Sequence, residues 1–189
     1  MTTAQRLRER LLDPAQAERT VVAGSATAAV LAPLWERGGE LVAVFIKRHG
    51  DLRLHAGQIS FPGGRRDPGD ADLTATALRE AHEEIGLEPV AVTVLGALTP
   101  TPTVVSDIAI YPFVGLIERP AAWTIAVAEV EAVLEAPLHE IAATHRLQRF
   151  ERPRGTVTTD AYTIAGETIW GATGRIVADL LARLDGPAA

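Results

Sequence analysis

Three glutamates stand close together near the middle of the chain, within the stretch 79–84. Glu80, Glu83 and Glu84 are three and four residues apart, so in a helix their side chains project from one face. Like charges at this spacing destabilise an isolated helix by about 0.2–0.5 kcal/mol per pair. Arg79 lies beside this face and can hold one carboxylate by a bidentate contact. Because Mg²⁺ prefers carboxylate oxygens and leaves positions free for substrate phosphates, the cluster predicts a divalent-metal site for phosphate chemistry. An ordinary solvated acidic helix face remains the alternative.

The segment before these glutamates is basic and contains a glycine pair. Residues 47–66 hold five lysines and arginines against one aspartate, a local excess of +4, which suits a substrate with several phosphates. We take Arg48, Arg53 and His55 as candidate substrate-binding residues. The arginines could instead only solubilise a loop, and His55 could only tie that loop down. Gly63-Gly64 would let the backbone approach a metal ion closely.

The composition is that of an ordinary globular chain with one uneven feature. The chain has 189 residues, of which 47% are hydrophobic and 22% charged, and this length fits one domain over residues 1–189. It has no cysteine, which excludes disulfides, thiolate nucleophiles and cysteine metal sites. Its net charge is −6, whereas duplex-DNA binders usually have a basic excess, so we expect no nucleic-acid partner. Residues 67–88 alone hold seven acids and one base, and their net charge of −6 equals that of the whole chain.

We expect a cytoplasmic protein that does not associate with membranes. No apolar run approaches the 18 residues that a membrane span needs. The N-terminus shows neither the apolar stretch nor the cleavage site of a secretory signal. Leu7, Leu11 and Leu12 lie at helical spacing instead, which predicts a helical N-terminal extension over residues 1–20, with a break at Asp13-Pro14.

Apolar patterning predicts a mixed α/β (α+β) domain around the glutamates. Their helix would begin after Asp70 or Asp72 and end at Gly86. The long segment 49–72 has little periodicity, and long loops in compact domains are usually functional. Expected strands cover 25–34 and 41–46 as a hairpin, then 90–98, 108–117, 123–127 and 156–164; expected helices cover 73–86, 127–134, 138–143 and 170–184, the last being a C-terminal helix.

Together these residues resemble the Nudix box, whose usual form is G-x5-E-x7-R-E-U-x-E-E-x-G-U, where U is a bulky aliphatic residue. The chain reads Gly64-x5-Asp70-x8-Arg79-Glu80-Ala81-x-Glu83-Glu84-x-Gly86-Leu87. It departs from the pattern in having Asp70 for the first glutamate, one extra residue before Arg79, and the small Ala81 at an aliphatic position. The acidic partner of Arg79 therefore stays open between Asp70 and Asp72.

The longer spacing also resembles one branch of that family, the coenzyme A pyrophosphatases. Their upstream signature is similar to R-S-x-x-L-R-x-H-x-G-x-x-x-F-P-G-G. The chain reads Arg48-His49-x-x-Leu52-Arg53-x-His55-x-Gly57-x-x-x-Phe61-Pro62-Gly63-Gly64, with His49 in place of the usual small residue. Shorter likenesses occur at 111–115, 135–138 and 169–173, so the resemblance extends from about residue 25 to 184.

The resemblance implies a Nudix-type α/β/α sandwich with a mixed β-sheet and a catalytic loop–helix–loop. It implies that Glu80 and Glu84 are the main ligands of Mg²⁺ or Mn²⁺, and that the Gly64 carbonyl helps to hold the cation. Glu83 would be a further ligand or a water-activating base, and Arg79 completes the catalytic set. The base could also come from a distant segment, for which the candidates are Glu118, Glu129, Glu131 and Glu167.

The implied reaction is hydrolysis of the pyrophosphate bond of coenzyme A or its derivatives. The products would be 3′,5′-ADP and 4′-phosphopantetheine or its acyl form, and relatives often pair as homodimers. Two alternatives remain. The substrate could be another nucleoside diphosphate derivative such as ADP-ribose or a dinucleotide, or the chain could be a non-catalytic Nudix-fold binding domain. All three box glutamates are present, which counts against the second alternative.

Overall fold

A mixed β-sheet forms the centre of the computed structural model, which describes residues 2–51, 55–103, 107–152 and 155–186. Its strands are β1 (Ala26–Arg37), β2 (Glu40–Arg48), β3 (Ile59–Ser60), β4 (Gly63–Arg65), β5 (Val92–Ala97), β6 (Thr101–Pro102), β7 (Ile108–Ile117) and β8 (Val130–Pro137). The order is β3-β2-β1-β7-β5, with β4 on β1, β6 on β7 and β8 on β2. The β1–β7 pair is parallel, whereas β1 and β2 form an antiparallel hairpin.

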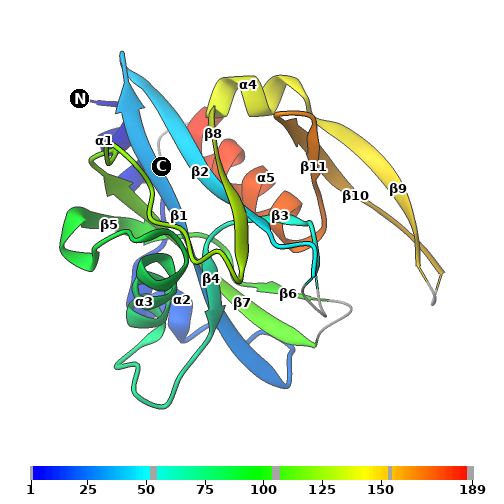
Figure 1. Ribbon diagram of the computed structural model, residues 1–189, viewed down its shortest axis with the longest axis horizontal. Coiled ribbons are helices and arrows are strands. Elements are labelled where there is room, and N and C mark those ends of the chain that lie inside the picture. The colour runs from blue at the N-terminus through cyan, green and yellow to red at the C-terminus, as the bar shows by residue number, and fades with distance from the viewer. Residues whose placement is uncertain (1, 52–54, 104–106, 153–154, 187–189) are drawn as a thin grey trace.

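Helices cover both faces of this sheet (Figure 1). They are α1 (Thr3–Arg8), α2 (Pro14–Glu18), α3 (Leu73–Ile85), α4 (Leu138–Ala143) and α5 (Gly171–Asp185), with a short 3₁₀ turn, η1, at Pro89–Ala91. One apolar cluster joins α2 and α3 to one face of the sheet. A second cluster joins α1, α4 and α5 to the other face. The architecture is therefore an α/β/α sandwich, and among the described residues no helix is long and apolar enough to cross a membrane.

A second, three-stranded sheet follows α4 and extends away from the body of the molecule (Figure 1). It consists of β9 (Arg146–Arg152), β10 (Gly155–Ile164) and β11 (Glu167–Ile169), in the order β11-β10-β9. Lys47 Nζ on β2 lies 3.0 Å from carboxylate oxygens of both Glu131 and Glu167. This double ion pair connects the small sheet to the main one.

Most predicted elements are confirmed, and two are wrong. The structure contains the hairpin, the helix that carries the glutamates, the strands at 108–117 and 156–164, and the helix at 138–143. The segment predicted as a helix over 127–134 instead contributes to strand β8, which pairs with β2 from Arg48 back to Val42. The predicted strand at 123–127 is irregular chain whose Trp123 and Ile125 pack on the α3 side. Val127, Val130 and Leu134 have helical spacing, but the segment forms a strand because the edge of β2 offers a pairing partner. The tendency of a segment to form a strand depends on such partners.

The predicted N-terminal extension is two short helices, and both belong to the core. Leu7 on α1 is completely buried. Arg10 Nη1 donates hydrogen bonds to the carbonyls of Arg183 and Leu184, at 3.0 and 2.7 Å. Leu12 forms an antiparallel bridge with Ala97. The segment therefore connects the last turn of α5 to strand β5.

We expect Leu7→Ala to lower the free energy of unfolding by about 2–4 kcal/mol, because it removes buried methyl groups and leaves a cavity. Val21→Ala is the matched control, since Val21 is 96% exposed and its truncation should change stability by less than about 0.5 kcal/mol. Urea denaturation followed by far-ultraviolet circular dichroism measures both. Equal unfolding midpoints for the two variants would show that α1 is not part of the cooperative core.

Candidate active site

Residues adjacent to helix α3 in the sequence cap both of its ends. Asp72 is the N-cap, and its Oδ1 accepts a hydrogen bond of 2.7 Å from the backbone N–H of Ala75. Gly86 ends the helix in the left-handed conformation at φ 69°, where a Cβ would lie 2.8 Å from Cβ of Thr124. The helix packs against the sheet through an apolar face formed by Leu73, Ala77, Ala81 and Ile85. Its acidic residues are thereby held at the edge of that face.

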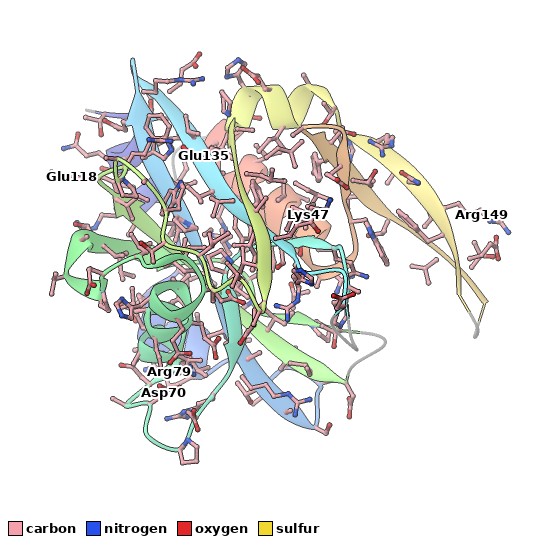
Figure 2. The ribbon with its side chains drawn as sticks, in the orientation of Figure 1. Lys47, Asp70, Arg79, Glu118, Glu135 and Arg149 are labelled. Atoms are coloured by element: carbon pink, nitrogen blue, oxygen red, sulfur yellow. The ribbon has the colours of Figure 1, made fainter. Side chains whose placement is uncertain are left out.

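Arg79 connects three carboxylates to the loop before the helix. Its Nε and Nη2 donate to the two oxygens of Asp70 at 2.9 and 3.1 Å, a bidentate ion pair, and the two residues lie side by side in Figure 2. Its Nη1 donates to Glu80 Oε1 at 2.9 Å and to Glu83 Oε2 at 3.0 Å. The Arg79 hydrogen bonds hold the pKa of Asp70 well below its ordinary value, and Asp70 in turn raises the pKa of Arg79. Asp70 is thus the partner of Arg79, while Asp72 caps the helix.

Glu84 is the most deeply buried acid described in the structure, with 2% of the residue exposed. Its Oε2 accepts a hydrogen bond of 2.8 Å from the backbone N–H of Gly63, and its Oε1 lies 3.5 Å from Arg48 Nη1. Burial raises the pKa of Glu84 to about 7, although the Gly63 N–H and the charge of Arg48 act in the opposite direction. At neutral pH this carboxyl therefore changes its charge readily.

Glu80 and Glu83 differ in their surroundings. Glu80 is partly buried against the glycine loop, so closely that a Cβ on Gly64 would lie 2.4 Å from Glu80 Oε1. Burial raises the pKa of Glu80, and the hydrogen bond from Arg79 opposes this shift. The Glu83 side chain is 55% exposed, and its ion pair is with Arg79. Glu80 and Glu84 thus face the glycine loop, whereas Glu83 lies at the rim.

Among the four distant acids, Glu129 is the one whose charge acts on the box. It raises the pKa of both Glu80 and Glu84 by like-charge repulsion. The segment before Glu129 is bonded to α3, since the N–H of Ala126 donates to the Glu84 carbonyl at 3.0 Å. Glu131 and Glu167 are instead paired with Lys47, and Glu118 lies well away from Arg79 in Figure 2. The sequence alone does not distinguish these four acids. Glu129 differs from the others only because the folded 118–129 segment brings it near α3.

The predicted substrate-binding residues have three different outcomes. Arg48 lies in the site beside Glu84, and its Nε is buried with no hydrogen-bond partner among the described residues. Ser60 Oγ on the adjacent strand β3 is also buried without a partner in that part of the chain, and sequence reasoning did not single it out. His55 has φ 59° and contacts the side chain of Gln58 at 3.0 Å. Arg53 lies outside the described residues.

The donor set suits a hard divalent cation, although the carboxylates are held by the protein's own groups. Within the described ranges no three acidic or histidine side chains are grouped to hold a metal ion. Arg79 holds Glu80 and Glu83, and the Gly63 N–H holds Glu84. The repulsion among Glu80, Glu84 and Glu129 is what a cation would relieve. Carboxylate oxygens without cysteine favour Mg²⁺ or Mn²⁺, so the ligand set of Glu80, Glu83, Glu84 and the Gly64 carbonyl stays a prediction.

Comparison with known proteins defines the class. Residues 25–157 match the NUDIX domain, so the chain belongs to the Nudix hydrolases, a family of pyrophosphohydrolases. It is 39% identical over 157 residues to the uncharacterized Nudix hydrolase NudL of Yersinia enterocolitica. That alignment covers 82% of this chain and 80% of NudL. NudL of Yersinia pestis is 37% identical over 155 residues, or 81% and 77% of the two chains.

Solved structures of distant relatives share the fold. A Nudix hydrolase from Alicyclobacillus acidocaldarius superposes with a TM-score of 0.57 at 20% identity, over 89% of this chain and 95% of that one. A MutT/nudix family protein from Enterococcus faecalis gives 0.58 at 17% identity, over 90% and 66%. At such low identity the likeness concerns the fold alone. It confirms the predicted Nudix fold with a mixed sheet.

The raised pKa of Glu84 predicts how the stability of the metal-free protein depends on pH. The folded state binds a proton that the unfolded chain has released, so stability falls as pH rises from the ordinary value of 4.5 to about 7. The loss should be on the order of 2–3 kcal/mol. Glu84→Gln cannot titrate, so its unfolding free energy in EDTA should lack this component between pH 5 and 8. If the unfolding free energies of the wild type and this variant changed with pH in parallel, the raised pKa of Glu84 would be contradicted.

Proposed function

We propose that this chain is a Mg²⁺- or Mn²⁺-dependent pyrophosphohydrolase of coenzyme A or its derivatives. The observation that carries the proposal is the contact between two motifs. The segment 48–64, which resembles the coenzyme A branch, places Arg48 and Gly63 on Glu84 and Gly64 against Glu80. These contacts between the branch signature and the Nudix box support a single site built from both motifs.

In this proposal the residues of the chain have distinct roles. Glu80 and Glu84 would hold the cation with the Gly64 carbonyl, and Glu83 would join them at the rim. The bound cation would polarise the phosphoryl oxygen and lower the pKa of a water molecule. Arg79 orients Glu80 and Glu83 through hydrogen bonds of 2.9 and 3.0 Å. No nucleophilic side chain is needed, because catalysis of phosphoryl transfer depends mainly on positioning and charge.

We assign the proton-accepting role to Glu129 rather than to Glu83. Glu83 Oε2 already accepts a hydrogen bond of 3.0 Å from Arg79 Nη1, so this oxygen is not free to accept a proton from a water molecule. Among the described residues Glu129 forms no ion pair with a cationic side chain, and its charge acts on both Glu80 and Glu84. Its backbone position is set by two hydrogen bonds, from its own N–H to the Ala126 carbonyl and from the His49 N–H to its carbonyl, both at 2.8 Å.

The substrate's phosphates would meet the basic segment at the other side of the site. Arg48 offers the buried Nε that has no partner in the described part of the chain, and a guanidinium suits bidentate phosphate binding. Arg53 and His55 follow in the same segment and remain predicted substrate-binding residues. A substrate with a diphosphate and a 3′-phosphate would use such a concentration of positive charge.

Mass-spectrometric product analysis of coenzyme A with Mg²⁺ or Mn²⁺, and with EDTA, tests the proposal. We expect 3′,5′-ADP and 4′-phosphopantetheine only when metal is present. Glu84→Gln should lower kcat/KM at least about 100-fold, because loss of a ligand exceeds the 10–100-fold cost typical of its supporting partners. Glu88→Gln is the matched control, since it makes the same charge change on an exposed side chain just beyond α3.

Two other outcomes would assign a different function to the protein. An enzyme that leaves coenzyme A and acyl-coenzyme A intact but hydrolyses ADP-ribose or a dinucleotide would belong to another substrate class. A folded protein that binds nucleotides but hydrolyses no diphosphate with either metal would be a binding domain.

Paired variants test the assignment of the base. Glu129→Gln should lower kcat by about 100-fold or more, since general-base catalysis contributes 10²–10⁴-fold. Glu118→Gln, which alters an acid that lies away from the site (Figure 2), should retain wild-type kcat. Steady-state rates across pH 6–9 with saturating Mn²⁺ measure both. If Glu83→Gln abolishes the pH dependence of kcat and Glu129→Gln does not, the base is Glu83.

A further inference from the structure

The first turn of α3 has a second capping carboxylate that comes from outside the helix. Glu18, the last residue of α2, accepts hydrogen bonds at its Oε1 from the backbone N–H groups of Leu73 and Thr74, at 3.1 and 3.3 Å. The first N–H groups of a helix have no partner within the helix. Two of them are therefore satisfied by a residue 55 and 56 positions earlier in the chain.

Glu18 and Asp72 together complete the N-terminus of α3. Asp72 Oδ1 accepts from the N–H of Ala75 at 2.7 Å, so each of the first three N–H groups of the helix has a carboxylate partner. Two negative charges at this position also interact favourably with the positive end of the helix dipole. The start of α3 is thus fixed by one carboxylate from the helix's own loop and one from α2.

The element that carries Glu18 is itself firmly anchored. Asp13 caps α2 through a hydrogen bond of 3.0 Å from the N–H of Gln16, and Ala17 is buried in the cluster on the α3 side of the sheet. Just after α2, the Thr20 carbonyl accepts from Tyr111 Oη on β7 at 2.8 Å. Figure 1 shows α2 and α3 on the same side of the sheet. Because α2 is anchored to the sheet, Glu18 fixes the position of the start of α3 relative to the sheet.

The capped turn leads directly into the residues of the site. Thr76, in that turn, donates its hydroxyl to Asp70 Oδ2 at 2.8 Å, and the same Asp70 oxygen accepts from Arg79 Nη2. One turn further along, Glu80 lies against Gly64 without room for a Cβ. A small shift of α3 along its axis would therefore disturb the fit between Glu80 and the glycine loop.

Glu18 lies before residue 25, where the match to the NUDIX domain begins. We propose that Glu18 is a positioning residue for the hydrolase: through the backbone of α3 it sets the distance of Glu80 and Glu84 from the glycine loop, and thereby the affinity for the divalent cation. This inference rests on the proposed function only in taking those two carboxylates as metal ligands. It gives the N-terminal extension a role in the site beyond its role in the core.

Mn²⁺ binding by the full chain, measured by isothermal titration calorimetry, tests the proposal without any substrate. Glu18→Ala should weaken Mn²⁺ binding by about 5-fold, comparable to the effect of losing one helix cap. Glu18→Gln keeps an oxygen that can accept both hydrogen bonds, so it should recover most of the affinity. Amide hydrogen exchange at Leu73 and Thr74 should accelerate in Glu18→Ala and return toward the wild-type rate in Glu18→Gln.

Thr2→Ala is the matched control, because it removes the N-cap of α1, whose side chain accepts from the N–H of Gln5. It should lower stability by a similar amount and leave Mn²⁺ affinity and exchange at Leu73 unchanged. The Mn²⁺ concentration that gives half-maximal rate should rise in Glu18→Ala, while kcat at saturating Mn²⁺ stays near the wild-type value.

Wild-type Mn²⁺ affinity in folded Glu18→Ala would overturn the proposal and leave Glu18 as a stabilising cap only. An equal loss of affinity in Thr2→Ala would overturn it too, since the effect would then follow from general destabilisation. If Glu18→Ala does not fold, Glu18→Gln decides: weaker Mn²⁺ binding with unchanged exchange at Leu73 and Thr74 would contradict positioning by hydrogen bonds. Failure of coenzyme A hydrolysis would affect only the proposed substrate, because the binding and exchange measurements do not involve it.

Discussion

The site depends on keeping one carboxylate, Glu84, almost entirely out of water. An isolated buried charge is strongly unfavourable, so such a group needs hydrogen bonds, a counter-charge or a proton. Here the Gly63 N–H and Arg48 provide the first two. The carboxyl can therefore exist in the fold only if the end of β2, the glycine loop and α3 assemble together. Gly63 itself has no space for a side chain, since a Cβ would lie 2.4 Å from the Ala29 carbonyl oxygen.

Two carboxyls of the same short segment are driven in opposite directions by their environments. Asp70 receives a bidentate arginine, and its pKa falls well below the ordinary value. Glu84 receives mainly desolvation, and its pKa rises to about 7. Such a separation is typical of sites in which one acid has a structural role and another takes part in chemistry. Arg79 also makes the concentrated acidity of residues 67–88 compatible with a stable helix, because it pairs with Asp70, Glu80 and Glu83.

Local patterns were sufficient for much of this molecule. The ends of α3 follow from residues next to them in the chain, Asp72 and Gly86, and the β1–β2 hairpin follows from two apolar runs around a glycine turn. Strand β8 could not be predicted in the same way. Its apolar residues fit helical spacing, but the free edge of β2 lies more than 80 positions earlier in the chain, and pairing with it decides the conformation. The small sheet differs from β8, because β10 pairs with β9 and β11, its immediate neighbours along the chain.

The amino-acid sequence by itself determined the family, the carboxylates of the box and their common helical face, because spacing along a helix is a local property. Only the tertiary structure decided which acid pairs with Arg79, which distant acid approaches Glu80 and Glu84, and that Arg48 and Glu18 bear on the same helix. Each of these choices is made between chemically equal candidates. Electrostatic and hydrogen-bonding partners act over a few ångströms in space, so a sequence shows which groups are available, and the packing of distant segments selects among them.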